Sequence, residues 1–273
     1  MFAHKIFSDI RIYQIPLMMT LLLIGVLVQD FSIRIEQVLL TYLFGITTQY
    51  LFLQYLNIKE VGYLSVIITC TGLSLLVRSN TLWVHPLLAI IVNSSKFIIR
   101  IDGKHIFNPA MLGVILGLNI FPSTWISPNQ WGYEFHIITW IIFFGMVVSG
   151  KSGNLIISIS FLIFYVGILT SRIVYFGYRW EVLYHQITNG SLLLFTFFMI
   201  TDPKTIPNHP LGKILYALIV SIIAYYWQFK LYKNNALIYG LFIATPIVPI
   251  IDKILKYKKF EWGEASKPTG GRS

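Results

Sequence analysis

The chain has 273 residues, of which 56% are apolar and 12% charged, and its formal net charge is +10. Soluble domains carry about 25% charged residues, so this composition excludes a soluble globular protein. It is typical of an all-α polytopic membrane protein, for which the bilayer is the solvent. The basic residues are scattered between apolar runs, which argues against nucleic-acid binding.

Apolar runs of about the length needed to span a bilayer, roughly 20 residues, follow one another along the chain. We therefore predict about ten transmembrane helices in a single domain, residues 1–262, with the first run retained as a signal-anchor helix. The polar end, residues 263–273, is predicted to be a disordered tail or an addition to the native chain. The runs lie near 12–28, 38–56, 61–77, 82–95, 106–121, 137–149, 154–171, 188–200, 211–229 and 236–251.

The distribution of Lys and Arg between the runs predicts the orientation. If the N-terminus is cytoplasmic and all ten runs cross, fifteen of the 21 basic residues lie inside and six outside. An even number of crossings then leaves both termini in the cytoplasm. The runs near 137–149 and 188–200 are short, and they are either tilted helices or half-helices that do not cross.

Two proline-marked pairs interrupt the apolar pattern. In DGKHIFNPAMLGVILG, Asn108-Pro109 predicts a helix start, because Asn caps free N–H groups and Pro at the first position loses no hydrogen bond. In FFMITDPKT, Asp202-Pro203 follows the same pattern, and Thr201 or Asp202 is predicted to cap a turn. These two breaks are the candidate polar positions inside the apolar part of the chain.

Two interpretations of the breaks stay open at this point. Breaks at corresponding places in two halves are typical of an inverted five-plus-five repeat with discontinuous helices, here roughly residues 12–121 and 137–251. The helix ends would then favour an anionic or hydrogen-bond-accepting ligand. In the other interpretation, both prolines simply start ordinary helices at the membrane surface.

Several motifs resemble the D subunit of Rnf electron-transport complexes and its relative, the B subunit of the sodium-pumping NADH:quinone reductase. The resemblance extends from about Lys96 to Trp262 and includes features of a stand-alone D-like branch. Its motifs are GKHIFNPAMLGVILG, FPSTW, LLLFTFFMITDPKT, IPNHPLG, TPIVPIIDK and KKFEW.

The resemblance implies a urea-transporter-like fold of ten helices and an electron-transfer role coupled to sodium or proton movement. It also implies FMN, which the family attaches to a Thr in a Ser/Thr-Gly-Ala-Thr motif. Between Trp125 and Ile137 this sequence has only ISPNQWGYEFH, and the stretch Thr188 to Ser191 has the wrong order. Covalent FMN is therefore not expected, whereas noncovalent FMN or riboflavin stays compatible with the sequence.

If a flavin is bound, Asn108 and Asp202 are expected to present helix ends to it, with Lys104 or Lys204 compensating its negative charge. Lys104 also ends a series with Lys96 and Arg100 at every fourth residue, which forms a basic stripe if this segment is helical. Such a stripe either faces anionic headgroups or clamps an anion such as a flavin phosphate, and the sequence leaves both open.

Other motifs predict no further chemistry. Residues 145–152, GMVVSGKS, match the phosphate-loop pattern, but apolar segments flank them on both sides, so a tight turn is expected instead. The six histidines show no ligand spacing, and the one cysteine, Cys70, is predicted to be a packing residue, so no metal site is expected.

Three hypotheses follow for the function. The first is a membrane subunit in electron transfer, at most a redox subunit of an oxidoreductase complex in the bacterial inner membrane, with other subunits, quinone and membrane lipid as partners. The second is a small-solute channel or transporter on the same scaffold. The third is a structural membrane subunit without a cofactor.

Overall fold

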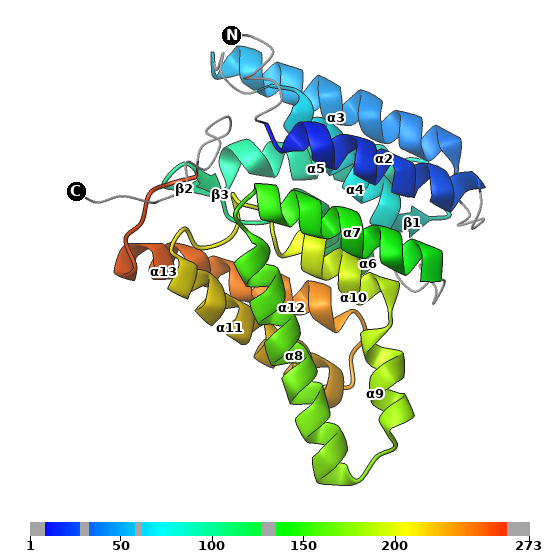
Figure 1. The fold of residues 1–273 in the computed structure, drawn as a ribbon. Helices are drawn as coiled ribbons and strands as arrows, with labels where there is room; N and C mark the ends of the chain where they lie inside the picture. The colour runs from blue at the N-terminus through cyan, green and yellow to red at the C-terminus, as the bar shows by residue number, and fades with distance from the viewer. Residues whose placement is uncertain (1–8, 28–32, 58–61, 127–134, 261–273) are drawn as a thin grey trace.

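The computed structural model describes residues 9–27, 33–57, 62–126 and 135–260, and most of these residues are helical. Each of the ten predicted apolar runs coincides with one helix or with consecutive helical segments (Figure 1). The first part of the chain forms α2 (Arg11–Leu27), α3 (Ile35–Tyr55), α4 (Leu64–Leu76), α5 (Val84–Ile98) and α6 (Pro109–Ile120).

The second part contains two composite helices. α10 (Gly190–Leu194) continues into the π-helical η2 (Phe195–Met199), and α12 (Ala236–Ala244) continues through the 3-10 turn η3 (Thr245–Ile247) into α13 (Val248–Ile254). The remaining helices are α7 (Phe135–Lys151), α8 (Leu155–Phe176), α9 (Trp180–Ile187) and α11 (Pro210–Phe229).

Helix length and hydropathy support a multi-pass membrane protein. Three described stretches are long and apolar enough to cross a bilayer: α8, α11 and the composite from Ala236 to Ile254. Six further apolar helices are shorter, with 10–17 residues. The predicted tail, residues 263–273, lies outside the described residues.

Two features differ from the prediction: four short strands, where only helices were expected, and one helix outside the ten predicted runs. β1 (Val77–Ser79) pairs antiparallel with β4 (Thr124–Ile126), and β2 (Arg100–Ile101) pairs with β3 (Lys104–His105). The unpredicted helix is α9, which has a single buried residue, Leu183, and lies with the end of α8 at the lower tip in Figure 1. It was missed because its eight residues are amphipathic rather than continuously apolar.

The two halves pack in the same order. In the first half α2 packs on α4, α3 on α5 and α5 on α6; in the second half α7 packs on α10, α8 on α11 and α11 on α12. The buried apolar side chains of both halves form one continuous core, with Leu73, Leu88 and Met111 from the first half and Phe161 and Phe195 from the second. This core holds the breaks between the helices in place.

Candidate functional site

Asn108 starts α6 in the way that the sequence predicts. Its backbone is extended, its side-chain Oδ1 accepts a hydrogen bond from the Met111 N–H at 3.2 Å, and Pro109 occupies the first helical position. The residue is 8% exposed, so this helix end is buried among other elements rather than placed in open solvent. The predicted cap is confirmed.

Asp202 orders a turn and does not start a helix. Its Oδ1 accepts the Lys204 N–H at 3.1 Å, and its backbone oxygen accepts the Thr205 N–H at 3.0 Å. The next helix, α11, starts only at Pro210, where His209 Nδ1 accepts the Leu211 N–H at 3.1 Å. The predicted turn is confirmed, but the predicted helix end at Asp202 is wrong.

A π-helical segment leads into this turn. In η2 the Ile200 N–H reaches back to the Phe195 oxygen at 3.0 Å, one residue further than in an α-helix. Such segments often occur at functional sites, because they change the direction of the helix end. The continuously apolar sequence FTFFM gives no signal for it.

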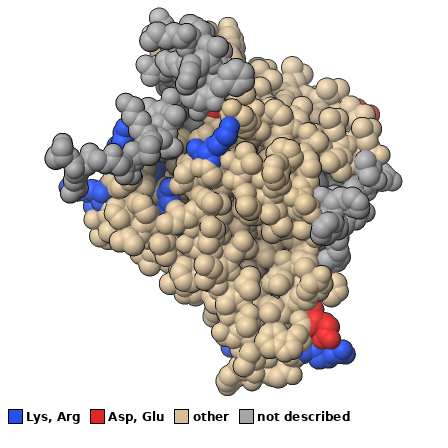
Figure 2. Space-filling view, viewed as in Figure 1, with Lys and Arg blue, Asp and Glu red and all other residues tan. Residues whose placement is uncertain are grey.

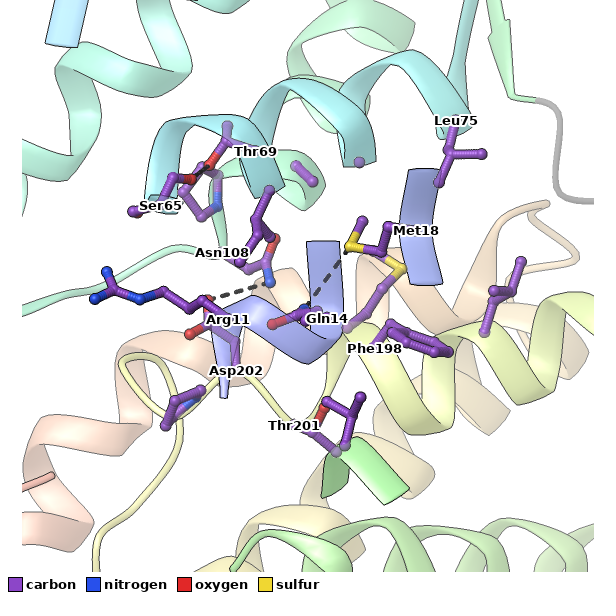
Figure 3. A pocket seen from close by; sticks show the side chains of 18 of the residues that line it. Arg11, Gln14, Met18, Ser65, Thr69, Leu75, Asn108, Phe198, Thr201 and Asp202 are labelled. Carbon is purple, nitrogen blue, oxygen red and sulfur yellow. Dashed lines mark hydrogen bonds between the residues drawn. The ribbon is translucent and has the colours of Figure 1, made fainter. Parts of the chain in front are cut away.

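The two proline-marked breaks meet although they lie 94 residues apart. Asn108 Nδ2 donates a hydrogen bond to Asp202 Oδ2 at 3.3 Å (Figure 3). His105 Nε2 lies 3.6 Å from the same oxygen. The His105 distance is slightly too long for a hydrogen bond, so this pair is electrostatic. We call these three residues the junction.

Several groups around Asp202 stabilise its negative charge. Burial alone would raise the pKa of the carboxyl, but interaction with His105 and the hydrogen bond from the Lys204 N–H outweigh burial and lower the pKa. Asp202 is therefore an anion at neutral pH. It accepts a hydrogen bond from the Asn108 amide and lies beside the His105 ring.

A cavity of about 120 Å³ borders the junction (Figure 3). Its polar side carries Asn108, Thr201 and Asp202, whereas Met18 and Phe198 contribute apolar surface. Helix α2 also contributes Arg11 and Gln14 to the lining, and α4 contributes Ser65 and Thr69. We call this space the junction cavity.

His105 also lines a second pocket, of about 280 Å³. This pocket contains Lys104 and Lys204, the two lysines that the sequence analysis predicted as site residues. Lys104 Nζ lies 2.9 Å from Asp252 Oδ2 and donates to the Ile206 oxygen at 2.7 Å. Burial lowers the pKa of Lys104, and its contact with Asp252 partly offsets that shift. Lys204 Nζ donates to the Phe260 oxygen at 3.2 Å.

The predicted basic stripe is wrong. α5 ends at Ile98, and the chain then forms a hairpin whose turn residues, Asp102 and Gly103, have φ angles of 52° and 83°. Arg100 is exposed, and its guanidinium donates to the Gly103 oxygen at 2.9 Å. Lys96 is buried and donates to Asn93 Oδ1 at 2.9 Å. The Asp-Gly pair, a common two-residue hairpin turn, was the overlooked signal.

The phosphate-loop match has a helical structure. Residues 145–148 lie inside α7, which ends at Lys151, and the chain turns through Gly153 before α8 begins. The Lys151 ammonium lies 3.4 Å from the centroid of the Tyr13 ring. The predicted turn therefore lies at residues 152–153, after a stretch that is helical up to Lys151, and no backbone cradle for a phosphate exists in this stretch.

Sequence comparison finds a family similarity in the second half of the chain. A model of the NQR2, RnfD, RnfE family matches residues 128–261. Over these residues the chain is similar to that family. Together with the apolar helices, the match supports a multi-pass membrane protein, and it supports other subunits of Rnf and NQR complexes as partners.

The family match includes one of the three junction residues, Asp202. Asp202 and Lys204 lie inside the matched residues, whereas Arg100, Lys104 and Asn108 precede them. Among curated proteins, none matches the chain. His105 and Asp252 belong to the site by geometry alone, because no sequence pattern singled them out.

Proposed function

We propose that this protein is a membrane electron-transfer subunit that binds a flavin noncovalently at the junction. The observation that carries the proposal is the contact between buried Asn108 and half-buried Asp202, which joins two chain breaks within an otherwise apolar region. Buried polar residues in membrane proteins are costly to retain, so they commonly mark functional sites.

The residues around the junction fit such a group. Among the described residues, the buried His105 Nε2 has no hydrogen-bond partner, so it can bind an acceptor on a ligand. Met18 and Phe198 provide apolar surface for a flat ring, and Lys104 and Lys204 compensate negative charge. The junction cavity alone is smaller than the roughly 300 Å³ of a typical ligand pocket, so a flavin also needs the adjoining pocket.

A bound flavin supplies one- and two-electron transfer, and the protein supplies its position and electrostatics. Asp202 keeps the Asn108 amide and the His105 ring oriented toward the cavity. The apolar helices around the cavity exclude water and strengthen these interactions. Quinone, or a redox centre of a neighbouring subunit, is the proposed electron partner, and coupling to ion movement belongs to the same proposal.

Two features support the proposed architecture, an inverted five-plus-five repeat with both termini in the cytoplasm of a bacterial cell. The halves share their packing order, and a His-Pro pair lies in the first turn of α5 (His85-Pro86) and at the start of α11 (His209-Pro210). The distribution of basic residues supports the orientation.

The absorbance spectrum of the protein purified from a flavin-replete membrane tests the proposal. We expect the absorbance band of a bound flavin. Denaturation should release this flavin into the filtrate, and the mass of the chain should show no FMN increment. Asn108→Ala should lower flavin occupancy, whereas Asn57→Ala, at a distant exposed position, should retain it. A covalent FMN adduct, or a colourless protein that does not take up added flavin, would contradict the proposal.

One observation favours a small-solute path as a second candidate. Leu76, Leu194 and Met199 line both the junction cavity and a further cavity of about 500 Å³. These three side chains therefore separate two cavities that would otherwise be continuous. Solute flux into liposomes that increases in Leu76→Ala would support this candidate. A protein with neither flux nor flavin that co-purifies with redox partners would instead support the structural subunit.

A further inference from the structure

A pocket rich in lysine lies beside the junction. Among the described residues, five lysines and two aspartates line its volume of about 280 Å³. Three distant segments form it: the β2–β3 hairpin, the turn after Asp202, and α13 with the chain that follows. Figure 2 shows Lys and Arg side chains gathered on the side where α13 and this hairpin lie in Figure 1. The charged lining residues of this lysine pocket are Lys104, Lys204, Lys253, Lys256, Lys259, Asp102 and Asp252.

The carboxylates of the pocket leave much of this positive charge uncompensated. Asp252 binds Lys104 at 2.9 Å, and its other contacts are the backbone and side-chain N–H groups of Asn208, at 2.8 and 3.1 Å. At Asp102 the backbone oxygen, not the carboxylate, accepts the Lys259 ammonium at 3.3 Å. Asp252 therefore neutralises one lysine of five.

Within the described part of the chain, two of the pocket's lysines have no counter-ion. Between described residues, neither Lys253 nor Lys256 makes an ion pair or a side-chain hydrogen bond. Lys253 lies in the last turn of α13, where the helix dipole also favours a positive charge. Clustering of like charges is unfavourable by itself, so a bound anion would stabilise this arrangement.

The pocket also contains an acceptor without a donor. The side-chain oxygen of Asn208 is buried and has no hydrogen-bond partner among the described residues, because its amide nitrogen is directed to Asp252. A buried unsatisfied oxygen is costly unless a ligand or water supplies a donor. A hydroxyl next to an anionic group would satisfy both Asn208 and the lysines.

We infer that the lysine pocket binds the phosphate group of an anionic, hydroxyl-bearing ligand. Two sources have this chemistry: the headgroup of an anionic phospholipid and a soluble phosphate compound. The pocket lies next to the junction and shares His105 with it, but the inference does not depend on a flavin. It adds Lys253, Lys256 and Asn208 to the functional residues of the chain.

Thermal unfolding of the whole purified protein tests the inference, with inorganic phosphate compared with chloride at equal ionic strength. Phosphate should raise the melting temperature, as any ligand of the native state does. Lys253→Gln with Lys256→Gln should weaken apparent phosphate affinity about fivefold per lysine, the effect of one basic residue near anionic headgroups. Lys230→Gln, at an exposed position outside the pocket, is the matched control.

The lipid source has its own arm. Native mass spectrometry of protein released from nanodiscs with phosphatidylglycerol, compared with phosphatidylcholine, should show retained phosphatidylglycerol that the double variant loses. Phosphate stabilisation without lipid retention identifies a soluble ligand, and lipid retention without it identifies a lipid site; both support the inference. It is overturned if neither probe binds, or if Lys230→Gln weakens binding as much as the double variant. Flavin content measured on the same samples reports separately on the junction.

Discussion

The cavities on the two sides of Leu76, Leu194 and Met199 differ in charge. On the junction side lie Asp202 and, next to it, the lysine pocket. The cavity on the other side is lined by side-chain amides and, among described residues, by one charged side chain, Lys233. Its amides belong to Gln186, Asn189, Gln228, Asn234 and Asn235.

This difference indicates which side handles anionic ligands. Amides donate and accept hydrogen bonds without charge, so the amide-lined cavity suits water or a neutral ligand. Lysines instead attract an anionic group and bind it through their ammonium donors. The predictions below test this division of roles, from the largest expected effect to the smallest.

Replacing Asp202 should have the largest effect. Asp202→Ala removes the acceptor of the Asn108 amide and the carboxylate that lies beside the His105 ring. We expect a loss of about 2–3 kcal/mol in the free energy of unfolding, below the value for a fully buried pair because the site is partly exposed. Chemical denaturation in detergent measures it. Glu181→Ala, at an exposed site on α9, should change stability by less than about 0.5 kcal/mol, and an equal loss there would refute the assignment.

Gly145→Ala should disturb the approach to the junction through packing. A Cβ at this position would lie 2.6 Å from the Phe197 side chain in η2, so the two helices must shift. We expect a cost of about 1–3 kcal/mol. Gly150→Ala in the same helix meets no atom within 4 Å and should be neutral or stabilising by up to about 1 kcal/mol. Similar costs for both variants would show that α7 and η2 do not pack as described.

The pH dependence of stability should show that the charged form of Asp202 stabilises the fold. The folded-state pKa of Asp202 is lowered, so its contribution is fully present above the unfolded pKa of about 3.9 and is lost as pH falls through the folded value. Melting temperatures measured from neutral pH downward should therefore fall less steeply in Asp202→Asn than in the wild type. Parallel curves would exclude Asp202 as a stabilising anion.

The smallest effect is expected in the amide-lined cavity. The Gln186 oxygen is buried without a hydrogen-bond partner among described residues, so Gln186→Leu removes an unsatisfied acceptor. The free energy of unfolding should change by less than about 1 kcal/mol, in either direction. A large loss of stability would show that this oxygen is satisfied by a structural ligand, and the cavity would then be a specific binding site.

The sequence predicted the parts of the fold that depend on local physics. Apolar runs long enough for a bilayer mark the helices, and Asn108 with Pro109 marks a helix start regardless of tertiary context. The hairpin at Asp102-Gly103 also had a local signal, which the regular spacing of Lys96, Arg100 and Lys104 concealed. Continuous apolar sequence hides η2, because an α-helix and a π-helix require the same residues there.

The sequence predicted the site only in part. Asn108 and Asp202 stood out, because proline pairs interrupting apolar runs are conspicuous. The contact between Lys104 and Asp252 joins residues 148 positions apart, and no local pattern predicts such a pairing. His105 was missed for the same reason, since its role depends on where the turn after η2 places Asp202.

A double-mutant cycle on flavin binding tests the central claim, that Asn108 and Asp202 form one binding site. Affinity for riboflavin and FMN, measured by fluorescence quenching, should fall about tenfold or more in Asn108→Ala and in Asp202→Ala, as expected for lost charge-assisted hydrogen bonds. The double variant should bind no more weakly than the weaker single variant, because each change already disrupts the same junction. Fully multiplicative losses, or a wild-type protein that binds neither flavin, would contradict the account.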